Sequence, residues 1–124
     1  MKLFLDDSRQ PQACVNFMRS RLGDNAKIYN EDWHHVKTYE EFIAFVEVNH
    51  LKITHISFDH DLAQIKYDSK LGRESFSYYE TTGYDCAKWL KNFYEEKQLK
   101  LPIILIHSQN SVGFQNIKFV FDGR

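Results

Sequence analysis

Short apolar runs alternate along the chain with longer segments in which apolar residues recur at helical spacing. The short runs predict strands over Lys2–Leu5, His35–Lys37, Ile53–Phe58 and Ile103–Ile106. The longer segments predict helices over residues 11–22, 39–49 and 83 to about 98, and a closing helix over residues 111–121. For this last segment, an edge strand over Ile117–Phe121 is the alternative.

Punctuating residues support these boundaries. Thr38 is followed three residues later by Glu41, and Thr82 by Asp85, a spacing typical of a capped helix start. Pro11 suits the first position of a helix, and Gly23 suits its end.

Strands that alternate with helices favour a parallel sheet with right-handed crossovers. We therefore predict a flavodoxin-like three-layer α/β sandwich with strand order 2-1-3-4. The sheet has four parallel strands, or five if the edge-strand alternative holds. Ile103–Ile106 is the most apolar run, which is typical of a central strand.

The chain of 124 residues predicts a single domain, residues 1–124, with one core. Residues 62–80 do not fit the alternation and are rich in Tyr, Ser and Lys. A connection of that length is usually functional. We expect it to act as a lid whose basic and aromatic residues contact the substrate, and an insertion packed on the sheet edge is the alternative.

Composition restricts the partners. Sixteen Lys and Arg against seventeen Asp and Glu give a net charge of -1, so the chain lacks the basic field that duplex DNA binding requires. A small phosphorylated ligand or an RNA end remains compatible with this charge. No apolar run approaches the length of a membrane span, and no secretory signal is expected. Cys14 and Cys86 read as buried thiols of a reducing compartment, so we expect a cytoplasmic protein.

Acids and histidines stand where the strands stop. Asp6 and Asp7 follow the first strand, Asp59–His60–Asp61 follows the third, and His107–Ser108 follows the fourth. The carboxyl ends of parallel strands share one edge, where open α/β folds bind ligands. Four carboxylates in one small volume need a cation or a raised pKa. The pattern therefore predicts a divalent-metal or phosphate-chemistry centre.

The residue types suggest roles. Alone, Asp6 and Asp7 read as a turn, but beside Asp59 they predict hard oxygen ligands for Mg²⁺ or Mn²⁺. His60 and His107, with Asp61, are candidates for general acid and base catalysis, and metal ligation is the alternative for His107.

A second set of residues is predicted to bind the substrate. Arg9, Ser108 and Asn110 are candidates for binding phosphate oxygens. Thr82 and Gly83 start a helix, where free backbone N–H groups could hold an anion, and plain capping is the alternative.

These residues resemble the cyclic-phosphate processing family of receiver-like domains, which are related to response-regulator receivers. The likeness runs from Leu3 to about Ile117. It is carried by Leu5–Arg9, Trp33 with Val36, Tyr39–Phe42, Ile56–Leu62, Thr82–Asp85, Trp89–Leu90 and Pro102 leading to His107–Asn110. The chain departs from the family pattern in long segments before Trp33 and after Leu62.

The resemblance implies a receiver-like fold and action on a cyclic phosphate, such as a 2',3'-cyclic RNA or nucleotide end, as in RNA repair, or a cyclic phosphate of ADP-ribose. Our leading hypothesis is a metal-assisted cyclic phosphodiesterase, a hydrolase. A signalling receiver that accepts a phosphoryl group on Asp59 is one alternative, and a metal- or nucleotide-binding adaptor without catalysis is another.

Overall fold

The structure is a computed structural model and describes residues 1–61 and 82–122. The elements in chain order are β1 (Lys2–Leu5), η1 (Pro11–Cys14), α1 (Val15–Leu22), η2 (Gly23–Asn30), β2 (His34–Val36), α2 (Tyr39–Asn49), β3 (His55–Phe58), α3 (Gly83–Glu96), β4 (Ile103–Ile106) and α4 (Ser111–Asp122). The lid predicted over residues 62–80 lies outside the described residues.

The four strands form one parallel sheet of order β2-β1-β3-β4, which confirms the predicted topology. Leu5 lies opposite Val36 and Phe58, and Phe58 lies opposite Ile106. The last residues of all four strands are therefore in register. The residues that follow them leave the sheet at the same level, which places the polar strand ends together.

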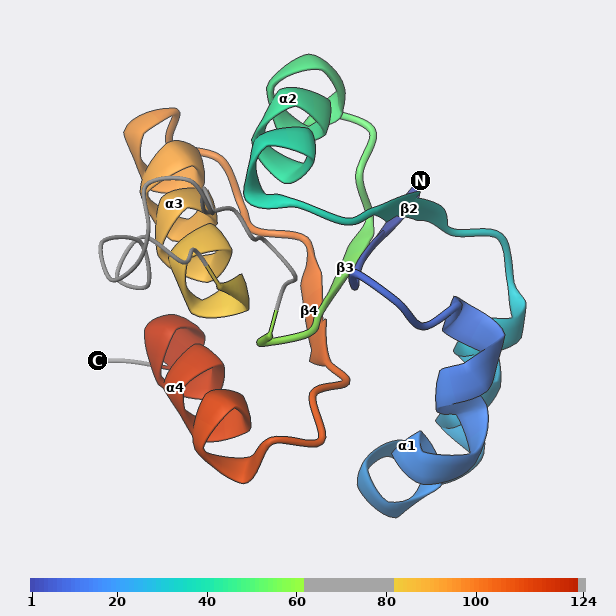
Figure 1. Ribbon diagram of the computed structural model, residues 1–124. Coiled ribbons are helices and arrows are strands. Elements are labelled where there is room, and N and C mark those ends of the chain that lie inside the picture. The colour runs from blue at the N-terminus through green and yellow to red at the C-terminus, as the bar shows by residue number, and fades with distance from the viewer. Residues whose placement is uncertain (62–81, 123–124) are drawn as a thin grey trace, which may run out of the picture.

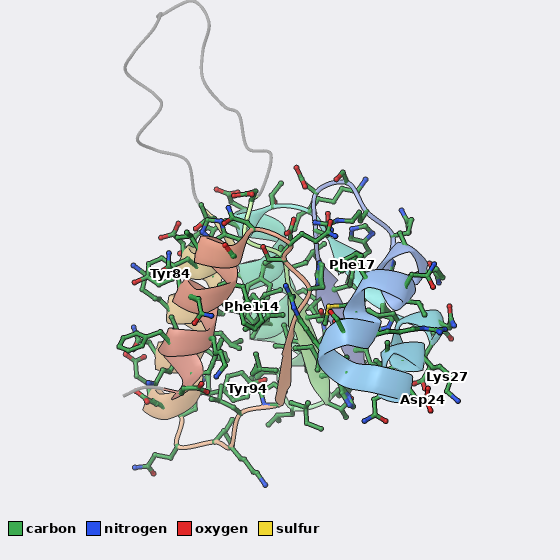
Figure 2. All side chains as sticks on the ribbon, turned by 90° about the horizontal axis from the view of Figure 1, so that it is seen from below. Phe17, Asp24, Lys27, Tyr84, Tyr94 and Phe114 are labelled. Atoms are coloured by element: carbon green, nitrogen blue, oxygen red, sulfur yellow. The ribbon has the colours of Figure 1, made fainter. Side chains whose placement is uncertain are left out.

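Helices cover both faces of the sheet, with α1 on one side and α2, α3 and α4 on the other (Figure 1). Alternate residues of a strand point to opposite faces. Phe4 accordingly packs in a cluster with residues of η1, α1 and η2, whereas Leu3 and Leu5 pack in the cluster that includes residues of α2 and α3. Figure 2 shows the same division, with Phe17 on the α1 side and Tyr84 on the side of α3 and α4. The result is the three-layer sandwich that the sequence predicts.

Both cysteines are buried free thiols, as expected. Burial raises the pKa of the Cys14 thiol to about 12. Among the described residues, no helix has the length and apolar character that crossing a membrane requires.

One expectation and one alternative need correction. In the described sheet β4 is an edge strand, and Ile103 is 57% exposed, so the high apolar content of this run does not mark a central strand. Ser111–Asp122 is a helix, so the edge-strand alternative is wrong. Gly23 ends α1 as predicted, with a φ of 61°, and the chain then continues into η2, which was not predicted and which buries Ala26 and Tyr29.

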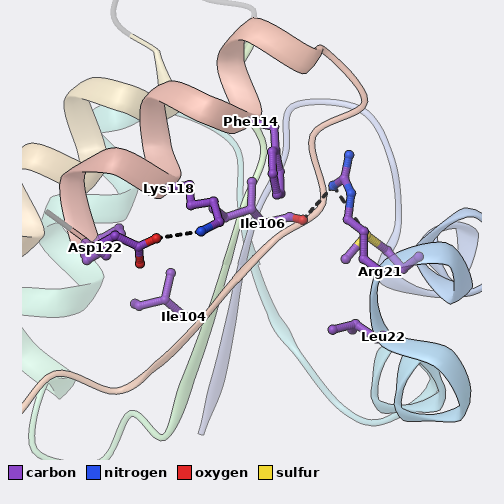
Figure 3. Close-up of a pocket in the computed structure, with 9 residues that line it drawn as sticks. Arg21, Leu22, Ile104, Ile106, Phe114, Lys118 and Asp122 are labelled. Atoms are coloured by element: carbon purple, nitrogen blue, oxygen red, sulfur yellow. Dashed lines mark hydrogen bonds and ion pairs between the residues drawn. The ribbon is translucent and has the colours of Figure 1, made fainter.

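A groove of about 290 Å³ runs along the open side of β4, between α1 and α4. Ile104, Ile106 and Phe114 contribute its apolar lining (Figure 3). The guanidinium of Arg21 donates hydrogen bonds to the carbonyls of Ile106 at 2.8 Å and Ser108 at 2.7 Å. Arg21 therefore covers part of the exposed strand edge.

Candidate functional site

The floor of the candidate site is formed by three buried side chains, Asp6, Asp59 and His107, each directly after a strand. Their backbone N–H groups donate to the carbonyls of Val36, Leu5 and Phe58, the last residues of neighbouring strands, respectively. Each of the three offers one ligand atom, and these atoms lie within 4.8 Å of one another. The predicted convergence of strand ends is therefore present for these three residues.

Asp6 is fully buried and accepts hydrogen bonds on both carboxylate oxygens. Oδ1 accepts from the backbone N–H groups of Ser8 and Arg9, each at 2.9 Å. Oδ2 is 3.0 Å from Nε2 of His107 and 3.2 Å from Nε of Arg9. Burial raises the pKa of Asp6, but hydrogen bonds from the His107 ring and the two backbone groups outweigh burial and place it below 3.8. Asp6 is thus held as a carboxylate.

A buried hydrogen-bond chain leads from Asp6 away from solvent. Nδ1 of His107 is 2.6 Å from Oγ of Ser57, and that oxygen is 2.7 Å from the hydroxyl of Tyr29. Burial lowers the pKa of His107, although its hydrogen bond to Asp6 opposes this effect, so the ring is neutral. Because the Asp6 carboxylate only accepts, Nε2 of His107 carries the proton. Ser57 then donates to Nδ1 and accepts from Tyr29.

His107 is fully buried and stacks on Phe4, with ring centroids 4.4 Å apart and an interplanar angle of 8°. Both its ring nitrogens are engaged inside the protein. In this arrangement His107 orients Asp6, and neither nitrogen is free to touch a substrate or to coordinate a cation. His107 therefore has no free ring nitrogen for the acid–base role that the sequence predicts.

Asp59 is nearly as buried as Asp6 but has fewer partners, namely Arg9 and the backbone N–H of His60. Its side chain is 6% exposed, and Nη2 of Arg9 at 3.3 Å is the single side-chain group that contacts its carboxylate among residues 1–61 and 82–122. Burial and then the neighbouring charge of Asp6 raise the pKa of Asp59 to about 7, although Arg9 opposes the shift. The Asp59 carboxylate is therefore a buried acceptor with unused capacity.

Arg9 links the two carboxylates. Its guanidinium contacts Asp6 through Nε and Asp59 through Nη2, and Nη1 donates to Oε1 of Gln109 at 3.2 Å. The ring of Phe17 lies 5.3 Å from its guanidinium carbon. The predicted phosphate ligand is thus at the site, paired with its acids.

His60, Asp61 and Asn110 form the rim of the site. Nδ1 of His60 is 2.8 Å from Oδ1 of Asp61, and the amide of Asn110 donates to the other Asp61 oxygen at 3.4 Å. The side chain of His60 is 17% exposed and that of Asp61 is 70% exposed. A carboxylate that accepts from Nδ1 leaves Nε2 of the imidazole as the proton-accepting atom. His60 therefore has the environment of a general base.

Two glycines allow the helices to approach this rim. A Cβ on Gly83 would lie 1.7 Å from the backbone oxygen of Asp59, and a Cβ on Gly113 would lie 2.4 Å from Cγ of His60. Any larger residue at either position requires the neighbouring group to move. The two positions set the distance of α3 and α4 from the residues that follow β3.

The start of α3 is closed by internal hydrogen bonds. Gly83 N–H donates to the carbonyl of His60, and the N–H groups of Tyr84 and Asp85 donate to Oγ1 of Thr82. Asp85 in turn accepts from the Thr82 backbone, which completes the capping box. The anion-binding hypothesis for Thr82 and Gly83 lacks a free donor here, and the capping alternative describes this helix start.

The remaining predicted residues lie at the edge of the site. Asp7 is half-buried and lies outside the triad, although its charge contributes to the raised pKa of Asp59. Ser108 is buried, and its hydroxyl accepts from the backbone N–H of Asn110 at 3.1 Å. It shapes the turn into α4.

Sequence reasoning missed Ser57, Tyr29 and Gln109. Ser57 is a lone hydroxyl inside an apolar strand, and such a residue needs a buried partner. The sequence therefore contains a signal that Ser57 has a buried hydrogen-bond partner. Tyr29 lies in a segment without a helical or strand pattern, so no sequence feature indicates that it is buried near His107.

The site fits a divalent cation. Asp6 and Asp59 offer hard oxygen donors of the kind that Mg²⁺ and Mn²⁺ prefer. The under-satisfied carboxylate of Asp59 is the observation that favours this fit, because a buried carboxylate needs compensating positive charge. His107, the third member of the triad, orients Asp6 through a hydrogen bond.

Comparison with known proteins agrees with this geometry. The sequence profile of the cyclic-phosphate processing receiver domain matches residues 1–122. No curated protein and no solved structure matches the chain. The match covers nearly the whole chain, and the sheet has the strand order expected of a receiver-like fold. The chain belongs to the family of cyclic-phosphate processing receiver domains.

Proposed function

We propose that this protein is a metal-assisted phosphoesterase that opens a cyclic phosphate. The observation that carries the proposal is the juxtaposition, at one sheet edge, of a buried carboxylate pair bridged by an arginine and a partly exposed His60–Asp61 pair. The pair Asp6 and Asp59 would hold the cation. The family to which the chain belongs is named for processing cyclic phosphates, which supports this substrate class.

When bound, a divalent cation would supply charge neutralisation and polarise a phosphoryl oxygen. His60, oriented by Asp61, takes a proton from the attacking water at Nε2. One P–O bond forms to the water oxygen, the P–O bond to the ribose oxygen breaks, and solvent supplies the proton for that leaving oxygen. Arg9 binds the phosphate oxygens, and Asn110 holds Asp61 from the opposite side.

The substrate that we propose is a small 2',3'-cyclic nucleotide, an RNA end of the same chemistry or a cyclic phosphate of ADP-ribose. The net charge of -1 supports a small or single-stranded ligand over duplex DNA. We also propose a cytoplasmic location, which the two buried free thiols support.

Site variants test the proposal. In the presence of Mg²⁺ or Mn²⁺, His60→Ala should lower kcat for a 2',3'-cyclic nucleotide about 100-fold or more, because general base catalysis is removed. Asp59→Asn should also abolish most turnover, through loss of the cation. Tyr94→Phe, which removes a buried hydroxyl bonded to the His50 carbonyl, is the control and should retain full activity. Wild-type rates in both site variants would refute the proposal.

A receiver-type phosphoacceptor role is the second candidate, because Asp59 directly follows β3 and lies beside Asp6. Receivers also use a Lys at the end of a fifth strand. Lys118, which follows β4, lies on α4 and pairs with Asp122 at 2.6 Å. Incubation with acetyl phosphate decides: a stable aspartyl phosphate on Asp59 without turnover of cyclic phosphates would favour signalling.

A further inference from the structure

Arg9 holds the position between Asp6 and Asp59 that a bound cation would need. Its Nε is 3.2 Å from Oδ2 of Asp6, and its Nη2 is 3.3 Å from Oδ1 of Asp59. The ligand atoms of these two acids lie within 4.8 Å of each other, so one small volume lies between them. A guanidinium and a divalent cation repel each other and cannot share that volume.

The charge balance favours exchange of one cation for the other. Asp6 and Asp59 together carry two negative charges when both are ionised, and Arg9 supplies one positive charge. A divalent cation compensates both carboxylates, and its contacts with oxygen are shorter than those of a guanidinium. Among the described residues, Asp59 pairs with one cation, Arg9 at 3.3 Å, and accepts from the His60 backbone, so it has fewer compensating donors than Asp6.

The Arg9 side chain can leave the space between the two acids without moving the backbone. Its backbone N–H donates to Oδ1 of Asp6 and stays fixed at 2.9 Å. The side chain is 28% exposed, and its contacts with both acids are at the long end of the hydrogen-bond range. Gln109, an exposed residue on the loop before α4, already holds Nη1 on the solvent side. The guanidinium therefore has a nearby position at the mouth of the site.

We propose that Arg9 is a displaceable counter-ion: a divalent cation that enters between Asp6 and Asp59 expels the guanidinium toward Gln109, where it binds the phosphate of the substrate. The inference rests on the proposed function for the cation and the phosphate. It adds that the two bind cooperatively, because the cation frees the phosphate-binding group. Coupling between two ligands is reciprocal, so phosphate must strengthen cation binding by the same factor.

Titration calorimetry of the full chain with Mg²⁺, and with inorganic phosphate as the probe, tests the proposal. Wild-type protein should bind Mg²⁺ about fivefold or more tightly when phosphate is present, a typical size for such coupling. Arg9→Ala should bind Mg²⁺ more tightly than wild type in the absence of phosphate, because its competitor is gone, and should show no enhancement by phosphate. Arg19→Ala removes an exposed arginine of α1 and is the control for net charge.

Nitrogen NMR of the Arg9 Nε–H group gives a direct readout without turnover. Mg²⁺ should shift this resonance and speed its exchange with water as the pair with Asp6 breaks. Weaker Mg²⁺ binding by Arg9→Ala, or an Arg9 signal that saturating Mg²⁺ leaves unchanged, would overturn the inference. A wild-type protein that fails to bind Mg²⁺ would overturn it as well. Cooperative binding without hydrolysis would support displacement and refute only the proposed phosphoesterase.

Discussion

At the scale of single residues, the site depends on a hydrogen-bond chain that runs in one direction. Tyr29 donates to Ser57, Ser57 to His107, and His107 to Asp6. The chain ends at the buried Tyr29, whose pKa burial raises far above its ordinary value. A chain with no outlet to solvent cannot deliver protons. Its consequence is a fixed orientation for Asp6.

The direction of this hydrogen-bond chain predicts which of two variants, Ser57→Ala or Tyr29→Phe, loses more stability. Ser57→Ala leaves both the Tyr29 hydroxyl and Nδ1 of His107 without partners, and each buried unsatisfied group costs about 1–3 kcal/mol. Tyr29→Phe leaves the Ser57–His107 hydrogen bond intact and should cost about 1 kcal/mol. Urea unfolding should therefore show the larger loss for Ser57→Ala. An equal or larger loss of stability for Tyr29→Phe would contradict the proposed direction of the hydrogen-bond chain.

Asp59 predicts a pH dependence of stability in the cation-free protein. Its pKa is raised from 3.8 to about 7 in the folded state, so between about pH 4 and 7 the folded state binds more protons than the unfolded state. The contribution of Asp59 to the free energy of unfolding must then fall as pH rises through this window. Asp59→Asn removes this contribution, so the variant should gain stability relative to wild type from pH 4 to 7.

Urea unfolding of both proteins in a chelating buffer, at several pH values, measures this difference. A difference between variant and wild type that stays constant from pH 4 to 8 would show that Asp59 has an ordinary pKa.

Which residues meet at the site was only partly predictable from sequence. Asp6, Asp59 and His107 follow apolar runs, and register alone brings them together. Ser57 lies on β3 and Tyr29 on η2, and the hydrogen-bond chain that they form with His107 depends on packing at the sheet face. Arg9 was predicted to bind phosphate, and its pairing with two acids follows from their burial, which no local pattern reveals.

At the scale of elements, two helices are held against the loop after β3 by glycines with different contacts. A Cβ on Gly83 would meet the backbone of Asp59, whereas a Cβ on Gly113 would meet the side chain of His60. Backbone cannot move without displacing β3, but a side chain can be pushed aside. The two positions should therefore respond differently to the same substitution.

Gly83→Ala should destabilise the protein by about 1–3 kcal/mol, as overpacking against fixed groups does. Gly113→Ala should destabilise it less, because alanine favours a helix by about 1 kcal/mol over glycine, while displacement of His60 lowers kcat. Urea unfolding and cyclic-nucleotide hydrolysis measured on both variants check this contrast. A Gly113→Ala protein with full kcat would argue against the role of His60.

Element boundaries were predictable where local chemistry decides them. Thr38 and Thr82 both cap helices as expected, with the Thr38 hydroxyl accepting from Glu41. The position of β4 at the edge of the described sheet was not recognised from its apolar run. The run is only partly buried, with Ile103 57% exposed, so its apolar composition does not reflect a central place in the sheet.

At the scale of the whole molecule, the open edge of β4 is a feature that the fold must protect. Unpaired strand edges promote pairing with other chains, and charged side chains are a common protection. Arg21 donates to the carbonyl of Ile106, the last residue of β4, and lies near Phe114 (Figure 3). It also donates to the carbonyl of Ser108 just beyond the strand, and its guanidinium carbon is 4.3 Å from the centre of the Phe114 ring. The three-layer order and the parallel topology are predictable from the alternation of strands and helices. The protection of the β4 edge by Arg21 is not.

Arg21→Ala should expose the edge and promote self-association at high protein concentration. Size-exclusion chromatography with light scattering over a concentration series measures it. Arg19→Ala, which also removes one positive charge from α1, should associate no more than the wild type. If both variants associate equally, net charge and not the strand edge is the cause.

The most direct test of the proposed function is phosphorus NMR of a 2',3'-cyclic nucleotide incubated with the protein, with and without Mg²⁺ or Mn²⁺. We predict conversion of the cyclic phosphate resonance to that of one phosphomonoester, 2' or 3', only when the cation is present, and loss of this conversion in His60→Ala. A cyclic phosphate that stays intact with either cation, across 2',3'-cyclic nucleotides and a cyclic phosphate of ADP-ribose, would contradict the account.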